Sequence, residues 1–374
     1  MDKIRLAKLA SRHGRNAVAE EAYRHFGIDY TRPVSFYAIV NENCNVKCRY
    51  CNYWRQDEYR EMPIEDWKRG LLSIKDFVGT FSISFSGGEP LLKRGFIDLL
   101  AWCRENGISA GVTTNGSGLN RKNSEKIVAA QPFNVNISVD APVAEVHDFL
   151  RGHKGLFKLL SDGIGYLVEE RVRQGVQFPI VIKPTVNSAN FRYLPALVEW
   201  TKEIGATCVS PQPMGKWTPE TFEELWIDED ELPELEAVID RLCEMAEAGA
   251  PILTPARLLK LIPDHFRGQT APREALPCRV GTRNFFIRAN GDVELCHRGF
   301  PVVGNLRQNT AREIWTGAKA REVRRDTYSC ERLCLVTCVS QKSIVDKAKM
   351  GIRLLMAQNE SAARHQKLVT METD

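Results

Sequence analysis

Residues 34–215 alternate between short apolar stretches and longer amphipathic ones, and this alternation constrains the fold more than any other feature of the chain. The apolar stretches predict strands at 34–40, 81–85, 109–113, 134–139, 180–186 and 207–212. The amphipathic stretches predict helices at 67–77, 96–106, 124–130, 156–174 and 194–204. Regular alternation of strand and helix produces parallel βαβ units. We therefore expect an α/β fold, a partial (β/α)6 barrel of the TIM type, with reactive groups at the carboxyl ends of its strands.

The sequence around the alternating region predicts four further segments. Basic residues and a thin apolar stripe indicate an N-terminal helical extension over 1–32, ahead of the barrel at 33–215. Acidic residues followed by a helical pattern indicate a solvated helical connector over 216–270. Five cysteines, a hairpin signal and a helix fall within 271–345, which we expect to be a separate C-terminal domain. Residues 346–374 alternate basic and apolar side chains, as a terminal helix with a frayed tail does.

The composition favours a cytoplasmic globular protein. The chain has 374 residues, of which 43% are hydrophobic and 26% charged, with a formal net charge of +4. Such a small charge gives no reason to expect a nucleic-acid partner. No apolar run approaches the roughly 18 residues of a membrane span, and the N-terminus lacks the apolar core of a signal peptide. The oligomeric state is left open by the sequence.

The eleven cysteines are unevenly distributed, and eight of them form two groups. The groups are Cys44, Cys48 and Cys51, then Cys278, Cys296, Cys330, Cys334 and Cys338. A structural zinc site closes with four ligands, whereas the first group supplies three locally. Three thiolates on a four-iron cluster leave one iron open to another ligand. Clustered thiolates in a cytosolic chain favour an iron–sulfur site, and half of a zinc site remains the alternative.

The first group resembles the signature of the radical S-adenosylmethionine (SAM) superfamily, Cys-x-x-x-Cys-x-x-Cys with an aromatic residue, Tyr50, before the last cysteine. The resemblance implies a [4Fe–4S] cluster that binds SAM. Ser86-Gly87-Gly88-Glu89-Pro90 follows the second predicted strand and resembles the segment that binds the methionyl amino group in this family. Glycines allow a close backbone approach, and Glu89 can pair with an ammonium group.

Polar residues that follow the next predicted strands extend the resemblance. Asn115 lies in a Thr-Asn-Gly turn after the third strand, and Ser138 and Asp140 end the fourth. The resemblance implies that Ser138 and Asp140 contact the ribose or carboxylate of SAM, and that Arg151 meets the methionyl carboxylate. A guanidinium suits that anion because it can bind both oxygens. For Asn115, Ser138 and Arg151 taken singly, a structural turn or a surface position remains the alternative.

The second cysteine group resembles the SPASM domain, or its shorter relative the twitch domain, which hold auxiliary clusters. Twelve residues separate Cys278 from Gly291 and four separate Gly291 from Cys296, and Asn290-Gly291 predicts a hairpin with a type I′ turn. A full SPASM domain uses seven cysteines, whereas this chain offers five. We therefore expect one auxiliary [4Fe–4S] cluster and leave a second one open. Which two of Cys330, Cys334 and Cys338 complete the ligands is also open, and structural zinc remains the alternative.

The resemblance implies an enzyme that cleaves SAM reductively and abstracts hydrogen with the resulting radical. Many proteins with this C-terminal domain modify ribosomal peptides, and those often carry a separate peptide-docking domain at the N-terminus. Only about thirty residues precede the barrel here, too few for such a domain. We therefore expect a small-molecule substrate such as a sugar, an aminocyclitol or a similar biosynthetic intermediate. The auxiliary cluster would take part in electron transfer, and a flavodoxin- or ferredoxin-type protein would supply electrons. Cys208, in the sixth predicted strand, is a candidate hydrogen donor to a substrate radical, although a buried core thiol is the simpler interpretation. The alternatives are a maturase of a ribosomally made peptide and a non-enzymatic iron–sulfur or zinc protein.

Overall fold

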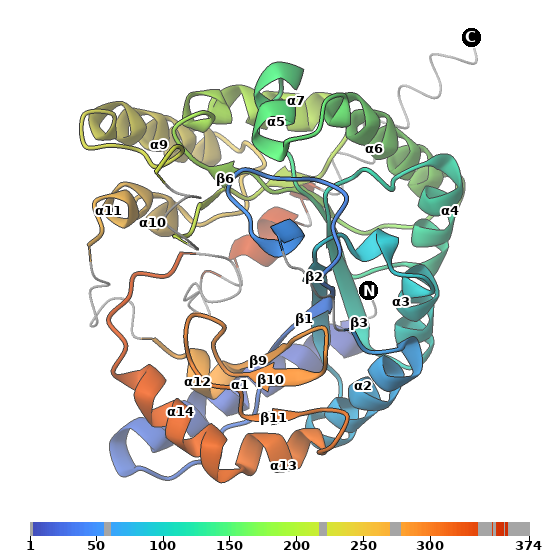
Figure 1. Cartoon of the computed structure of the whole chain (residues 1–374), viewed down its shortest axis with the longest axis vertical. Helices are drawn as coiled ribbons and strands as arrows, with labels where there is room; N and C mark the ends of the chain where they lie inside the picture. Colours follow the sequence, from blue (N-terminus) through green and yellow to red (C-terminus); the bar gives the residue numbers. More distant parts are fainter. Residues whose placement is uncertain are drawn as a thin grey trace.

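The computed structural model describes residues 3–55, 61–216, 223–269 and 278–335, together with 346, 349–354 and 356–357. A curved nine-stranded sheet forms the centre of the molecule, in the order β11-β10-β9-β1-β2-β3-β4-β5-β7, with helices along its outer side (Figure 1). The strands are β1 (Ser35–Asn41), β2 (Ser82–Gly87), β3 (Ser109–Thr114), β4 (Val135–Ile137), β5 (Ile180–Ile182), β7 (Cys208–Val209), β9 (Asn284–Ile287), β10 (Asp292–Glu294) and β11 (Gly304–Asn305). The six strands from β1 to β7 pair in parallel, which confirms the predicted partial barrel.

The helices that alternate with these strands match the sequence pattern closely. They are α2 (Ile64–Val78), α3 (Phe96–Glu105), α4 (Arg121–Ala130), α6 (Leu156–Arg173) and α7 (Leu194–Glu203). A further short helix, α5 (Ala144–Arg151), lies between β4 and α6 and was not predicted. Two predicted strands are shorter than expected, since 180–186 is interrupted before β6 (Thr185–Val186) and 207–212 before β8 (Gln212–Pro213). Pro184 and Pro211 stand at the two breaks, where proline cannot donate a ladder hydrogen bond.

The two faces of β1 show how the barrel is filled. Phe36, Ala38 and Val40 belong to the main core, between the sheet and its helices. Ile39, which points to the opposite face, packs instead with Phe286 of β9 inside the barrel. Because side chains alternate along a strand, the inward positions of neighbouring strands form the wall that a substrate would meet.

The C-terminal segment joins the barrel sheet directly. Strand β9 pairs in parallel with β1, from Ser35 opposite Asn284 to Ala38 opposite Ile287, and β10 then returns antiparallel to β9. The predicted hairpin is present, but the predicted type I′ turn is wrong. That turn needs a positive φ at both central residues, and of the two only Gly291 has one. The Gly291 N–H donates to the Arg288 carbonyl, which gives a three-residue loop with glycine at its left-handed position.

The remaining described helices lie on either side of that hairpin in the chain. They are α9 (Leu232–Glu247), α10 (Ala256–Leu259), α11 (Ile262–Phe266), α12 (Val280–Arg283), α13 (Ala311–Thr316) and α14 (Ala318–Tyr328). The connector is packed as well as solvated, because α9 contacts α7 and Ile252 bridges to Val209 at the edge of the sheet. None of the helices within the described ranges is both long and apolar enough to cross a membrane.

Helix α1 (Lys3–Phe26) packs on the C-terminal segment, as expected of a packing helix. Glu20, 5% exposed, accepts hydrogen bonds from Arg283 Nε at 2.5 Å and Nη2 at 2.6 Å, and from Thr282 Oγ1 at 3.1 Å. Arg279 Nη1 adds an ion pair at 3.2 Å. A single buried carboxylate therefore connects the N-terminal helix to the segment that carries Cys278 and β9.

Replacing Glu20 by glutamine should destabilise the protein by roughly 3 kcal/mol, because it leaves the half-buried Arg283 without its counter-charge. Glu21→Gln is the matched control, since the Glu21 side chain is 43% exposed and surface ion pairs contribute less than about 1 kcal/mol. Thermal unfolding of both variants measures the difference. Equal unfolding midpoints would contradict the role assigned to Glu20.

Candidate active site

The first cysteine group lies in the loop that follows β1, at the carboxyl end of that strand. Cys48 is buried, and Cys44 and Cys51 are half-buried. The pKa of Cys48 is raised to about 12, mainly by burial and in part by the nearby thiols of Cys51 and Cys44, so the three cysteines are neighbours. The three thiols thus lie at the carboxyl end of a barrel strand, and their role as cluster ligands stays a prediction.

Each of these thiols is met by N–H donors. Asn115 Nδ2 lies 3.9 Å from Cys44 Sγ, and Arg151 Nη1 lies 3.7 Å from Cys48 Sγ. Backbone N–H groups of Asn52 and Tyr53 donate to Cys51. Donors of this kind stabilise a thiolate more than a thiol, so the loop suits sulfur ligands of a metal cluster.

The Gly-Gly-Glu loop after β2 is pressed against the cysteine loop. The Gly88 N–H donates to the Asn41 carbonyl at 3.1 Å, and the Glu89 N–H donates to the Asn43 carbonyl at 2.8 Å. A Cβ on Gly88 would lie 2.1 Å from Asn43 O, and one on Gly87 would lie 2.2 Å from Asn41 O. Gly87 also has φ of +147°. These glycines are therefore required for the contact between the two loops, whatever else they bind.

Glu89 connects the ends of β2 and β3. Its carboxylate is fully buried and accepts from Thr114 Oγ1 at 2.7 Å, the Asn115 N–H at 2.7 Å and the Leu91 N–H at 3.0 Å. Burial raises its pKa, and these three hydrogen bonds act in the opposite direction. A carboxylate has about four acceptor positions, so one remains for a further donor. Pairing of Glu89 with an ammonium group stays a prediction.

A second buried network lies at the end of β4. Asp140 is 0% exposed, and its Oδ2 accepts from Tyr50 Oη at 2.6 Å and pairs with Arg151 Nε at 2.8 Å. Asp140 Oδ1 accepts from the Thr185 N–H at 3.0 Å. Ser138, half-buried at the same strand end, donates its N–H to the Thr114 carbonyl. Residues far apart in sequence are thus brought together around the cysteine loop, as predicted.

Several buried polar atoms at this site have no hydrogen-bond partner among the described residues. They include Asn41 Oδ1, an acceptor beside Gly87, and Nη2 of Arg151, a donor on the guanidinium whose Nη1 lies near Cys48. Sequence reasoning missed Asn41, although its place at the carboxyl end of β1 was a usable signal. Near the three cysteines, the unpaired acceptor Asn41 Oδ1 could thus receive the ammonium group of an amino acid, and the unpaired donor Arg151 Nη2 could bind its carboxylate.

Four cysteines of the second group gather in the C-terminal segment. Burial raises the pKa of Cys296 to about 12, and Cys278, Cys334 and Cys330 each contribute to that rise, so the four thiols are neighbours. N–H groups donate to three of them, from Val280 to Cys278 and from Arg298 to Cys296 and Cys334. Cys338 lies outside the described residues.

No three His, Cys, Asp or Glu side chains within the described ranges are arranged to hold a metal ion. That result concerns a single ion. In a four-iron cluster each thiolate binds a different iron, so the cysteine ligands stand farther apart than the ligands of one metal ion.

Cys208 lies in β7 opposite Val181 of β5 and is 2% exposed. Its neighbour Val209 packs in the main core, so by strand alternation Cys208 faces the barrel interior. Burial raises the pKa of this thiol to about 12, which keeps it protonated at neutral pH.

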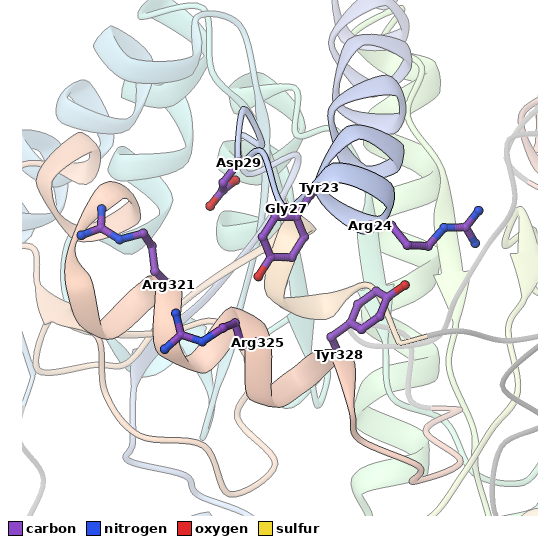
Figure 2. A pocket seen from close by; sticks show the side chains of 7 residues that line it. All are labelled: Tyr23, Arg24, Gly27, Asp29, Arg321, Arg325 and Tyr328. Atoms are coloured by element: carbon purple, nitrogen blue, oxygen red, sulfur yellow. The ribbon is translucent and has the colours of Figure 1, made fainter.

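A surface pocket of about 380 Å³ lies between the end of α1 and α14 (Figure 2). Arg321 and Arg325 point to one side of the central Tyr23 ring, with Arg24 and Tyr328 on the other. None of the predicted site residues lines this pocket, so it is separate from both cysteine sites.

Comparison with known families favours iron–sulfur clusters over zinc for the two cysteine groups. The profile of the Radical SAM superfamily matches residues 39–194, and that of the SPASM iron–sulfur cluster-binding domain matches residues 278–339. The chain belongs to the radical SAM superfamily and carries a C-terminal SPASM domain. These two domains imply SAM, the [4Fe–4S] cluster that binds it, and an auxiliary cluster, and the thiols and unpaired polar atoms described above fit those groups.

Individual radical SAM proteins resemble this chain over most of its length. Fe-coproporphyrin III synthase of Methanosarcina barkeri is 27% identical in an alignment of 299 positions that covers 74% of this chain and 72% of that protein. PqqA peptide cyclase of Rhodopseudomonas palustris is 23% identical in an alignment of 319 positions that covers 83% of this chain and 79% of that protein. The structure of Streptococcus suis SuiB bound to SAM superposes with a TM-score of 0.65 at 17% identity, covering 82% of this chain and 71% of SuiB. SuiB is also known bound to its precursor peptide SuiA.

Proposed function

We propose that this radical SAM enzyme abstracts a hydrogen atom from a side chain of a peptide substrate. When bound, SAM and its cluster supply a 5′-deoxyadenosyl radical for that abstraction. Three cysteines, Cys44, Cys48 and Cys51, would hold the cluster. A flavodoxin- or ferredoxin-type protein would provide the electron.

The residues around the cluster would bind and orient SAM. Asn41 Oδ1 and the free acceptor position of Glu89 would receive the methionyl ammonium, beside the close backbone of Gly87 and Gly88. Arg151 Nη2 would donate to the methionyl carboxylate. Ser138, half-buried at the end of β4, would reach the ribose, and Asn115 would fix the cysteine loop through its contacts with Cys44 and Asn45.

The observation that carries the peptide substrate is the similarity to PqqA peptide cyclase, which covers 83% of this chain. The sequence alone favoured a sugar or aminocyclitol, and the relatives support its peptide alternative better. A tetrapyrrole is the second candidate, because Fe-coproporphyrin III synthase shares slightly more identity over a slightly shorter stretch.

Product analysis separates these substrates. The reduced enzyme would be incubated anaerobically with SAM and either a short peptide encoded beside its gene, Fe-coproporphyrin III, or an aminocyclitol. Of the three candidate substrates, we expect only the peptide to change mass. Only the peptide should also raise the amount of 5′-deoxyadenosine above the level formed without substrate. Modification of the tetrapyrrole with no change in the peptide would overturn the proposed substrate class and leave the radical chemistry intact.

We propose Cys278, Cys296, Cys330 and Cys334 as the ligands of one auxiliary cluster, since these four thiols are neighbours. Cys334→Ala should therefore lower the iron content from about eight to about four atoms per chain. Cys338→Ala should leave it near about eight. Iron analysis after anaerobic reconstitution tests both. Loss of iron in the Cys338 variant alone would contradict this ligand set, and about twelve atoms in the unaltered protein would indicate two auxiliary clusters.

Cys208 would return a hydrogen atom to a substrate radical if the reaction inverts a stereocentre, because it faces the barrel interior as a protonated thiol. On this proposal Cys208→Ala still cleaves SAM but forms less than about a tenth of the product per 5′-deoxyadenosine. Val181→Ala, on the facing strand position, is the matched control for packing. Unchanged product formation in the Cys208 variant would remove the residue from the mechanism.

A further inference from the structure

A buried cation lies directly behind the cysteine loop. Arg151 is the last residue of α5 and is 6% exposed. Its Nη1 is 3.7 Å from Cys48 Sγ, and its guanidinium carbon is 5.4 Å from the centre of the Tyr50 ring. Arginine stays protonated in proteins, and Asp140 pairs with Arg151, so the group is a permanent cation.

The backbone holds this cation close to the loop. The Arg49 N–H donates to the Leu150 carbonyl at 3.0 Å. Gly152, with φ of +60°, ends α5 so close to the loop that a Cβ there would lie 2.4 Å from Lys47 O. Arg151 therefore has little freedom to move away from Cys48.

The counter-charge pairs with a different nitrogen of the guanidinium from the one that lies near Cys48. Asp140 Oδ2 is 2.8 Å from Arg151 Nε and accepts from Tyr50 Oη, while Oδ1 accepts from the Thr185 N–H. The described contacts of Asp140 thus include an ion pair and two hydrogen bonds that keep its charge in place. The Arg151–Asp140 pair has no net charge, and its positively charged member, Arg151, is the one in contact with the Cys48 thiol.

We propose that Arg151 and Asp140 form an oriented ion pair that sets the reduction potential of the cluster held by Cys44, Cys48 and Cys51. Asp140 acts through Arg151 and is a positioning residue, as is Tyr50. This inference rests on the proposed function only in assuming that a cluster occupies those three cysteines. It adds a role for Arg151 besides binding the methionyl carboxylate.

The sign of each effect follows from electrostatics. Reduction adds negative charge to the cluster, and both a nearby cation and an N–H donor to a ligand sulfur stabilise that charge and raise the potential. Removing Arg151 should therefore lower the potential. Removing the charge of Asp140 leaves the cation uncompensated in a poorly solvated site and should raise it. A structural defect at either position would have no reason to produce shifts of opposite sign.

The test is a redox titration of the reconstituted full-length protein in which electron paramagnetic resonance monitors the reduced clusters. The cluster of interest is recognised because its reduced signal changes when SAM is added, whereas that of the auxiliary cluster should not. The variants are Arg151→Gln, Asp140→Asn and the double variant. Arg171→Gln is the control, since Arg171 is buried on α6 and donates to the Phe178 and Gly205 carbonyls.

We expect Arg151→Gln to shift the midpoint of the SAM-responsive signal to a more negative value and Asp140→Asn to a more positive one. The double variant should fall between them, and Arg171→Gln should match the unaltered protein. Shifts of the same sign, or no shift at full iron content, would overturn the proposal.

If Arg151→Gln fails to retain iron, Arg151→Lys keeps the charge and takes its place. The midpoint of Arg151→Lys should then differ less from that of the unaltered protein than the midpoint of Asp140→Asn does. A larger shift in Arg151→Lys than in Asp140→Asn would overturn the proposal. Absence of any SAM-responsive signal in the unaltered protein would instead contradict the proposed function itself.

Discussion

We expect Cys51→Ala to remove about four iron atoms per chain and to reduce SAM cleavage to the level of a reaction without enzyme. The reason is that three thiolates are the smallest set that holds a four-iron cluster with one open iron, and the loop after β1 offers no fourth cysteine. The auxiliary cluster should survive, because its ligands lie in the C-terminal segment. Iron analysis and chromatographic measurement of 5′-deoxyadenosine give the two readouts.

Cys243→Ala is the matched control for that experiment. Cys243 is a buried cysteine on α9, away from both cysteine groups in the chain. This variant should keep all its iron and its activity. A Cys51 variant that still cleaves SAM at a normal rate would show that the loop after β1 does not hold the reactive cluster.

Gly88→Ala should be a strongly damaging single-methyl substitution near the site. The added Cβ would lie 2.1 Å from Asn43 O and 2.7 Å from Glu42 O, and both are backbone atoms that cannot rotate away. The cysteine loop and the Gly-Gly-Glu loop must therefore separate, which should break the Glu89 N–H bond to Asn43. We expect a loss of about 3 kcal/mol, at the upper end of the usual cost of overpacking, and at least about a tenfold weaker affinity for SAM, since 1.4 kcal/mol is a factor of ten.

Gly165→Ala separates this effect from glycine replacement in general. Gly165 lies within α6, and a Cβ there would meet no atom within 4 Å. Because alanine is the better helix former by about 1 kcal/mol, that variant should be at least as stable as the unaltered protein. Thermal unfolding and equilibrium binding of SAM measure both variants. Normal SAM affinity in Gly88→Ala would mean that the contact between the two loops is not needed for binding.

The barrel could be predicted because five of its six strands are mostly buried, β2 being the exception, and its helices are amphipathic. β1 and β3 begin and end within about a residue of the apolar runs that predict them. The cysteine loop and the Gly-Gly-Glu loop could be placed at one edge because parallel strands end on the same side. Helix α5 was missed because its eight residues give too short a periodic pattern to recognise.

What the sequence could not supply were pairings between distant residues. The attachment of β9 to β1 joins residues about 250 apart, and neither strand carries a local mark of its partner. Glu89 and Arg151 were assigned to ligand groups from the family resemblance and their charge, yet both also bind groups of the protein. Glu89 accepts from Thr114, and Arg151 pairs with Asp140. The turn at Asn290-Gly291 shows the same limit, because the hairpin was predicted correctly while its loop length depends on the strand register.

The most direct test of the account is SAM cleavage by the anaerobically purified, reconstituted protein reduced with dithionite. We predict a brown protein with about eight iron atoms per chain, which forms 5′-deoxyadenosine and methionine in equal amounts. A colourless protein that contains zinc and leaves SAM intact would contradict it.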